Sequence, residues 1–357
     1  MKQAFLKAAA LFLVAALFTF SVPFVRGYCA QSYILMDGNT GAQLAGKNVH
    51  ERTLIASTTK IMTALVALRL LDVNSIVVVP REAVGVEGSS MYLQEGESLQ
   101  VLDLLYGLML ESGNDAAVAL AIASCGSVEA FVSEMNDTAR ELGLQDTHFE
   151  NPHGLDGKDH YSSAYDLGLL TIQGLKDPLF RQIVSRKEIT VGNRVLRNHN
   201  RLLWMKDGII GVKTGYTKAA GRILVSALEY EGRTLIAVTI KDGNDWQDHL
   251  SLYEYGKNLY SCRPIIKKDS LIGHFPTIQG QIAYVYADHD LSAFVRQEES
   301  PILDIRYPLV LMGHEGKAIL DVYVGHLLLG RICARWEVKT NGTNSKTDCL
   351  PRSMLPP

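Results

Sequence analysis

The order of strand-like and helix-like segments constrains the fold of this chain more than any other feature. Residues 32–48, "SYILMDGNTGAQLAGKN", place two apolar runs around the turn "DGNTG", which predicts a hairpin. Residues 80–180 are mostly helical in pattern, strands return after residue 186, and helical spacing returns at 245–260. Strands on both sides of a helical middle favour an α+β fold. We expect an antiparallel sheet flanked by helices, with an inserted helical lobe and a cleft between lobe and sheet.

Individual segments refine this expectation. Periodic apolar residues predict a helix beginning near Ala56 and further helices at 99–110, 115–124, 128–143, 163–175 and 245–260. Alternating or β-branched runs predict strands at 187–191, 194–198, 222–230 and 233–241. Residues 150–161, "ENPHGLDGKDHY", are expected to form a loop.

The chain of 357 residues is too long for one ordinary core, which predicts more than one domain. We assign residues 31–262 to the large α+β domain and 263–340, which are strand-like throughout, to a small C-terminal β domain. Residues 341–357 are polar and contain three prolines, with no continuous apolar face. We expect this tail to be disordered.

The first 30 residues differ from the rest. Lys2 and Lys7 precede an apolar run at 8–20, and small residues follow at 27–30, which is the pattern of a secretory signal peptide. We therefore expect an exported protein. Membrane association is expected only if the signal remains uncleaved.

Composition argues against several classes of function. The net charge of −3 comes with no basic stripe, so we expect no nucleic-acid partner. Five cysteines, at 29, 125, 262, 333 and 349, form no CxxC pair and no zinc spacing. No HxxxH or HxH spacing indicates a metal either, and we expect neither metal nor organic cofactor.

Ser57 and Lys60 lie three residues apart at the start of a predicted helix, which puts them on one face. A serine needs a base to become a nucleophile, and a lysine can be that base only when burial or another cation lowers its pKa. The alternative is a helix cap followed by a solvated lysine. Among the serines of the chain, only Ser57 has lysine at the third following position.

Two further segments carry polar residues suited to such a site. Ser112 and Asn114 lie in "ESGNDAAVAL", before a helix, where they could pass a proton and orient a lysine; the alternative is an ordinary N-cap. Lys213, Thr214 and Gly215 lie in "GVKTGYTKAAG" at a predicted strand edge. A cation and a hydroxyl there could bind a carboxylate while the edge pairs with an extended peptide; the alternative is an ordinary turn.

The three motifs SxxK, SxN and KTG are recognised together in penicillin-binding proteins and serine β-lactamases, and here they occur in that order. The segments "LIASTTKIMTAL", "MLESGNDAAVALA", "NPHGLDGKDHYSSAYDLGLL", "RNHNRLLW" and "GVKTGYTKAAG" resemble those of the low-molecular-mass D-alanyl-D-alanine carboxypeptidases, the penicillin-binding-protein-5-like serine peptidases. The resemblance covers residues 31–262, and it implies the β-lactamase/transpeptidase-like fold with the small β domain behind it.

The resemblance also implies a role for each matching residue. Ser57 would be acylated, Lys60 would be its base, and Ser112 would relay a proton to the leaving amine. The substrate-binding positions would be Asn114, Lys213, Thr214, Gly215 and Tyr216, and the backbone N–H groups of Ser57 and Tyr216 would form the oxyanion hole. The expected partners are peptidoglycan stem peptides ending in D-Ala-D-Ala, with β-lactams as covalent inhibitors. The resemblance also implies a bacterial protein at the outer face of the cell membrane or in the cell wall.

Two departures from the family pattern and two rival functions remain. Many relatives end in an amphipathic membrane helix, which the pattern of residues 341–357 does not predict here. Many relatives carry a carboxylate-binding arginine after the last sheet strand, where this chain has none, so Lys213 and Thr214, or Arg222, are left for that task. His153 and His199 are expected to be structural or to line the cleft. A class A β-lactamase would need Glu150 to activate water, and a catalytically silent peptidoglycan-binding scaffold would not need all three motifs.

Overall fold

The structure is a computed structural model of the chain and describes residues 27–277, 281–296, 303–306, 315–324 and 327–338. Most of the predicted signal peptide and all of the predicted tail at 341–357 lie outside the described residues.

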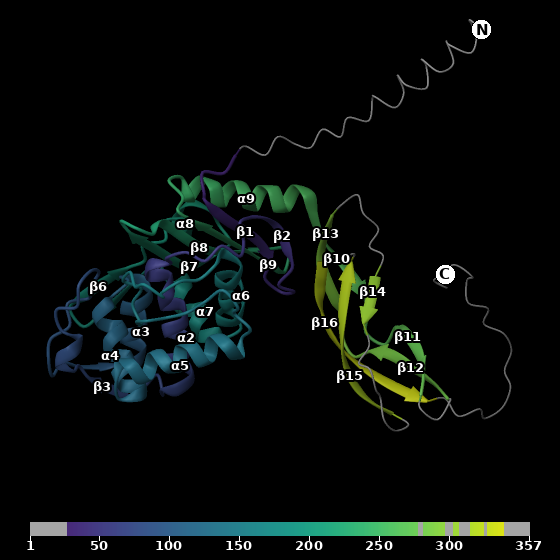
Figure 1. Cartoon of the computed structure of the whole chain (residues 1–357), viewed down its shortest axis with the longest axis horizontal. Coiled ribbons are helices and arrows are strands. Elements are labelled where there is room, and N and C mark those ends of the chain that lie inside the picture. The colour runs from purple at the N-terminus through teal and green to yellow at the C-terminus, as the bar shows by residue number, and fades with distance from the viewer. Residues whose placement is uncertain (1–26, 278–280, 297–302, 307–314, 325–326, 339–357) are drawn as a thin grey trace, which may run out of the picture.

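A five-stranded antiparallel sheet forms the centre of the larger part of the molecule (Figure 1). Its order is β2-β1-β9-β8-β7, so the first strands of the chain lie beside strands from its middle. The bounds are β1 Ser32–Asp37, β2 Gln43–Lys47, β7 Ile209–Thr217, β8 Gly221–Tyr230 and β9 Arg233–Ile240. The predicted sheet and its opening hairpin are confirmed, and β7, which carries Lys213, is an edge strand.

Both faces of this sheet are buried, because successive side chains of a strand point to opposite faces. Ile34 and Met36 of β1 join the core under the helical lobe, whereas Leu35 between them joins a second core under α9 (Asp245–Leu259). The predicted helix at 245–260 is therefore confirmed as the cover of one face.

The helical lobe covers the other face. It contains the short turn η1 (Ala56–Thr59), α2 (Lys60–Leu70), α3 (Val101–Leu110), α4 (Asn114–Cys125), α5 (Val128–Glu141), α6 (Ala164–Leu175) and α7 (Pro178–Ser185). Side-chain caps fix where several of these begin: Ser127, Ser163 and Asp177 each accept a hydrogen bond from the first turn of α5, α6 and α7. The predicted helices are confirmed with ends shifted by at most two residues, except that the one expected near Ala56 opens with η1 and becomes α-helical at Lys60. α7 was not predicted.

Two small antiparallel pairs and two short helical segments complete this part. β3 (Ile76–Val78) pairs with β4 (Ser98–Gln100), and β5 (Glu188–Val191) pairs with β6 (Arg194–Arg197). The predicted strands at 187–191 and 194–198 exist, but they form their own hairpin outside the main sheet. The short helices are η2 (Arg81–Ala83) and α8 (Leu202–Met205).

The C-terminal strands form a ribbon and a second sheet. β10 (Tyr260–Ile266) pairs with β13 (Leu291–Arg296), and the sheet order is β11-β12-β16-β15-β14. The sheet strands are β11 Leu271–Pro276, β12 Ile282–Ala287, β14 Leu303–Arg306, β15 Glu315–Val324 and β16 Leu327–Val338. This sheet has its own core around Trp336, whereas Tyr260 and Phe294 of the ribbon belong to the core under α9. The domain boundary after residue 262 remains a prediction.

Within the described ranges, no single helix combines the length and apolar composition needed to cross a membrane. α4 and α5 meet those criteria only as a pair bent by 85°.

Candidate active site

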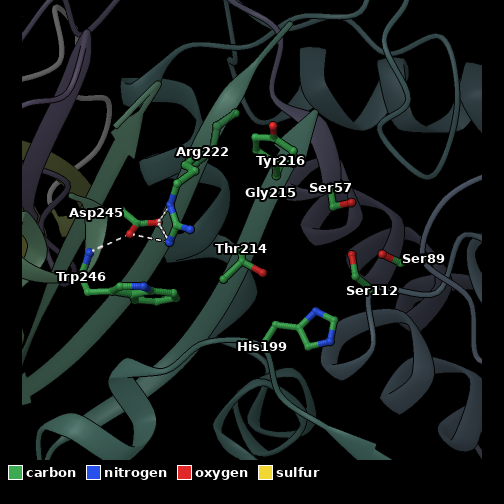
Figure 2. Close-up of a pocket in the computed structure, with 11 residues that line it drawn as sticks. Ser57, Ser89, Ser112, His199, Thr214, Gly215, Tyr216, Arg222, Asp245 and Trp246 are labelled. Atoms are coloured by element: carbon green, nitrogen blue, oxygen red, sulfur yellow. Dashed lines mark hydrogen bonds and ion pairs between the residues drawn. The ribbon is translucent and has the colours of Figure 1, made fainter. Parts of the chain in front are cut away.

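A cavity of about 310 Å³ opens where β7 faces the helical lobe (Figure 2). Five of the predicted site residues line it, and Lys60, Asn114 and Lys213 are buried. The lining residues are Ser57, Ser89, Ser112, His199, Thr214, Gly215, Tyr216, Arg222, Ile223, Asp245 and Trp246.

The three motifs contribute to one site from three separate elements. Ser57 lies in η1 and Lys60 begins α2, so the lysine is one turn along from the serine. Lys60 Nζ lies 3.0 Å from Ser57 Oγ, 2.7 Å from Asn114 Oδ1 and 2.6 Å from the backbone oxygen of His153. The alternative in which Lys60 is a solvated lysine is wrong, because its side chain is fully buried.

The environment of Lys60 disfavours its charged form. Burial removes water from the ammonium, the nearby Lys213 adds like charge, and together they hold the pKa of Lys60 well below its usual range. The charge of Asp115 raises the pKa of Lys60, but by less than burial and Lys213 lower it. The amine of Lys60 is thereby suited to accept a proton.

The turn that carries Ser57 is held by its own threonines. Thr58 Oγ1 donates to the Ile55 oxygen at 2.6 Å, and Thr59 Oγ1 donates to the Ala56 oxygen at 2.9 Å. Thr59 Oγ1 also lies 2.7 Å from Nε2 of the buried His160. Because Nδ1 of His160 accepts from the Glu150 N–H at 3.0 Å, the ring proton is assigned to Nε2, which donates to Thr59.

The predicted loop at 150–161 packs its backbone against the turn that carries Ser57. Asn151 Oδ1 accepts the N–H groups of His153 and Gly154, and the Pro152 oxygen accepts from Thr63 Oγ1 at 2.5 Å. Gly154 has φ +92°, and a Cβ there would collide with the Ala56 oxygen. This packing places the His153 oxygen on Lys60, so His153 acts through its backbone. Burial lowers the pKa of its ring to about 4.

Ser112 follows α3 with φ +62°, a backbone region that a non-glycine residue seldom adopts. Its Oγ is buried, and the described part of the chain gives it no hydrogen-bond partner. Such a hydroxyl at a cavity wall is available to a bound ligand. Asn114 is the first residue of α4 rather than its cap, and its Nδ2 donates to the Glu87 oxygen.

Lys213 and Thr214 lie on the edge strand. Lys213 is 1% exposed, its Nζ donates to the Thr214 oxygen at 3.0 Å, and burial lowers its pKa to about 7. Gly215 permits close packing on the turn that carries Ser57, since a Cβ there would lie 3.1 Å from the Ile55 oxygen and 3.3 Å from the Ser57 nitrogen. The predicted strand edge is confirmed.

His199 lines the cavity, as expected. Its Nε2 lies 3.5 Å from Glu111 Oε2, and burial together with Lys213 lowers its pKa.

Four lining residues were not singled out from the sequence: Ser89, Ile223, Asp245 and Trp246. Asp245 and Trp246 begin α9, and the acidic first turn of that predicted helix was the available signal. Asp245 accepts two hydrogen bonds from Nη2 of Arg222, at 2.7 and 2.8 Å, and one from Nε at 3.1 Å. Arg222 had been considered for carboxylate binding, and it lines the cavity beside Thr214.

One group of potential metal ligands occurs in the described residues: Cys29, Asp242 and Asp248, whose ligand atoms lie within 4.8 Å of one another. The group shares no residue with the cavity lining.

An antiparallel sheet bearing KTG on its edge, with SxxK and SxN brought together beside it, is the arrangement of the penicillin-recognising serine enzymes. A sequence profile described as D-alanyl-D-alanine carboxypeptidase matches residues 20–244, and the chain belongs to this family.

Individual relatives and solved structures are consistent with this family. The chain is 34% identical over 335 residues to the D-alanyl-D-alanine carboxypeptidase DacD of Salmonella typhimurium, covering 87% of this chain and 85% of the relative. Penicillin binding protein 5 from Haemophilus influenzae has a similar structure, with a TM-score of 0.74 at 28% identity over 87% of this chain and 97% of that one. A mutant Streptomyces K15 DD-transpeptidase gives a TM-score of 0.63 at 32% identity, covering 65% of this chain and 99% of that one. The predicted α+β, transpeptidase-like fold is confirmed.

Proposed function

We propose that this chain is an exported serine peptidase that removes the terminal D-alanine from peptidoglycan stem peptides through an acyl-enzyme on Ser57. The observation that carries the proposal is the contact of 3.0 Å between Ser57 Oγ and Nζ of the fully buried Lys60. Membership of the carboxypeptidase family supports the substrate class.

The neighbours of Nζ determine where the lone pair of a neutral Lys60 points. A neutral amine has two N–H groups and one lone pair, and Nζ of Lys60 has three neighbours. The oxygens of Asn114 and His153 can only accept, so they take the two N–H groups. The lone pair is left for the hydroxyl of Ser57, the one neighbour that carries a proton. Deprotonated Lys60 is therefore a base aimed at Ser57.

The proposed acylation begins at Ser57. Ser57 Oγ attacks the carbonyl carbon of the penultimate D-alanine while its proton passes to Lys60. The oxyanion is held by the backbone N–H groups of Ser57 and Tyr216, each contributing about 3 kcal/mol in comparable enzymes. The amide C–N bond breaks, and the proton held by Lys60 passes through Ser112 to the leaving amine, which leaves Lys60 neutral. Ser112 Oγ is buried and has no hydrogen-bond partner among the described residues. Water then attacks the ester with Lys60 as base, and that proton returns to Ser57 Oγ as the shortened peptide leaves.

Substrate binding is assigned to the remaining residues. Asn114 binds the substrate backbone, and Lys213 supports Ser112 with its positive charge. Thr214 and Gly215 on the edge strand pair with an extended peptide and hold its terminal carboxylate. Arg222 lies beside Thr214 and supplies a second cation for that carboxylate. β-Lactams are expected to acylate the same serine.

The rival β-lactamase needs a glutamate at the acylated serine. Glu150 is exposed and does not line the cavity.

The deciding experiment is a time course of intact mass after adding penicillin to the full chain, with Ser57→Ala as control. A persistent single adduct that Ser57→Ala lacks is the expected result. Rapid penicillin hydrolysis without an adduct would favour the β-lactamase, and neither adduct nor hydrolysis would favour the silent scaffold. Release of D-alanine from a peptide ending in D-Ala-D-Ala checks the natural reaction.

A further inference from the structure

Two acidic side chains are buried where the start of the described chain meets the start of α9 (Figure 1). Asp242 follows β9 and is 1% exposed, and Asp248 lies in the first turn of α9 and is 6% exposed. Cys29 precedes β1, and its N–H donates to Asp248 Oδ2 at 2.8 Å. The thiol sulfur of Cys29 and one carboxylate oxygen of each aspartate lie within 4.8 Å of one another, which is close enough to share one ion.

The two carboxylates lack a compensating charge. Among the described residues, no lysine or arginine forms an ion pair with either of them; Arg222, whose backbone oxygen accepts the Asp242 N–H, is paired with Asp245 instead. Asp242 Oδ2 is buried and has no hydrogen-bond partner in the described part of the chain. Burial and the like charge of Asp248 raise the pKa of Asp242 to about 6. Buried carboxylates are usually paired with a cation or bound to a metal, so a ligand is expected at the free oxygen.

Hydrogen bonds hold both carboxylates in place for such a ligand. Asp242 Oδ1 accepts the Asn244 N–H at 2.9 Å, which leaves Oδ2 free. Asp248 Oδ1 accepts from Asn244 Nδ2 at 3.3 Å, and Oδ2 accepts the Cys29 N–H. Each carboxylate oxygen can accept at more than one position, so Asp248 can still bind an ion. Contacts of this outer kind orient the ligands in metal sites.

The thiol of Cys29 decides the class of cation. Calcium and magnesium prefer large shells of oxygen ligands, whereas zinc prefers a small tetrahedral shell and accepts thiolate sulfur together with carboxylate oxygen. Cys29 is a free, exposed cysteine, so its thiol can lose a proton to solvent and a water molecule can reach the remaining position. The three side chains therefore suit zinc.

Cys29 lies within the predicted signal peptide, so the site depends on where the chain is cut. The segment that follows is packed on the large domain: Ala30 is 1% exposed, and the Gln31 N–H donates to the Ile240 oxygen at 3.1 Å. Gly27 is the small residue that a cut before Cys29 requires. Cleavage after Gly27 would keep all three ligands in the exported chain.

We propose that Cys29, Asp242 and Asp248 bind one zinc ion, which ties the N-terminal segment of the exported chain to α9. The thiol of Cys29 releases its proton to solvent as the zinc–sulfur bond forms, and each aspartate binds through a carboxylate oxygen. Sequence spacing does not reveal this group, because its residues come together only when the chain folds.

The test uses protein purified from cells that express the full chain, with its first residue read from its intact mass. A chelator removes bound metal, and zinc is then added back. We expect one zinc per chain by calorimetry and a higher melting temperature, because zinc binds the folded state. Cobalt in place of zinc should give the near-ultraviolet absorption of a cobalt–thiolate bond.

Cys29→Ser should weaken zinc binding by about a hundredfold and abolish the cobalt–thiolate absorption, since loss of even an outer partner can weaken metal binding that much. Cys333→Ser is the matched control: it changes another free, exposed cysteine and should bind zinc as the unchanged chain does. Asp242→Asn should weaken zinc binding as well. Penicillin adduct formation reports whether each variant is folded, and if Asp242→Asn is not, Cys29→Ser alone decides.

Four outcomes would overturn the proposal. They are a purified chain that starts after Cys29, no zinc binding by the unchanged chain, zinc binding that Cys29→Ser leaves as it was, and calcium binding as tight as that of zinc. The last would indicate a site made of oxygens alone. None of these outcomes bears on acylation of Ser57, so the zinc site and the proposed function stand or fall separately.

Discussion

Lys60 and Lys213 are two buried amines that the proposed mechanism needs in opposite protonation states. Lys60 must be neutral to accept the proton of Ser57, and Lys213 must be charged to support Ser112 and the substrate carboxylate. Burial lowers the pKa of both, to about 7 for Lys213. Lys213 in turn lowers the pKa of Lys60, so a charge on one amine favours the neutral form of the other.

A bell-shaped dependence of kcat/KM on pH follows. Activity rises with pH as Lys60 loses its proton, and falls above about pH 7 as Lys213 loses its own. Lys213→Arg keeps its charge at all accessible pH values, so the falling limb should disappear even if activity is lower throughout. Initial rates with a D-Ala-D-Ala peptide across the pH range measure both profiles. A falling limb that persists in Lys213→Arg would assign it to another group.

Removal of the Lys60 amine tests the base directly. Lys60→Ala should slow acylation by penicillin by about a hundredfold to ten-thousandfold, the usual contribution of a general base. Lys218→Ala, which changes an exposed lysine just after β7, is the control and should acylate normally. A normal acylation rate in a folded Lys60→Ala protein would show that another group takes the proton.

At the scale of elements, the turn that carries Ser57 is packed between the loop at 150–161 and the edge strand β7, which approach it through Gly154 and Gly215. Gly154 and Gly143 both have positive φ, +92° and +71°, so alanine strains either backbone. Only at residue 154 would the added Cβ collide with the turn, because nothing lies within 4 Å of a Cβ at residue 143.

Gly154→Ala should therefore lower both the penicillin acylation rate and the melting temperature by more than Gly143→Ala. The difference between the two variants isolates the collision with the Ala56 oxygen from the shared backbone strain. Equal effects in both would mean that the loop yields without moving Ser57.

The elements themselves were largely predictable, because helices and strands have periods that the sequence displays. The hairpin at 32–48 and the helices follow from local patterns. The separate pairing of β5 with β6 does not, because alternation shows that a segment is a strand and not which strand it joins.

The same limit applies to the site. The motifs located Ser57, Lys60 and Ser112, but the contacts that complete the site come from distant segments. The backbone oxygen of His153 on Lys60, the bond from His160 to Thr59 and the pairing of Asp245 with Arg222 each join residues that no local pattern connects. Such contacts depend on tertiary packing.

At the scale of the whole molecule, Asp37 ties the main sheet to the C-terminal ribbon. This carboxylate is fully buried at the end of β1, is paired with Arg233 of β9 at 2.8 Å, and accepts the N–H of Phe294 in β13 at 3.4 Å. The pair replaces solvation that the carboxylate has lost.

Arg233→Ala should lower the free energy of unfolding by about 3–5 kcal/mol, because it leaves the buried carboxylate of Asp37 without its counter-ion. Arg335→Ala is the control. It breaks the pair with Asp269, whose side chains are 45% and 58% exposed, and should cost no more than about 1 kcal/mol. Urea denaturation of both variants measures the difference. Similar losses would mean that water or another group replaces Arg233.

The burial of Lys60 and Lys213 also allows the packing around the site to be followed by chemical labelling of lysines. Reagents that acylate amines need contact with a neutral nitrogen, and these two are 0% and 1% exposed although their lowered pKa values favour the reactive form. In the folded molecule they should escape modification, while exposed lysines such as Lys218 react. Unfolding would expose both amines, so peptide mapping of labelled lysines would report loss of the packing around the site without any substrate.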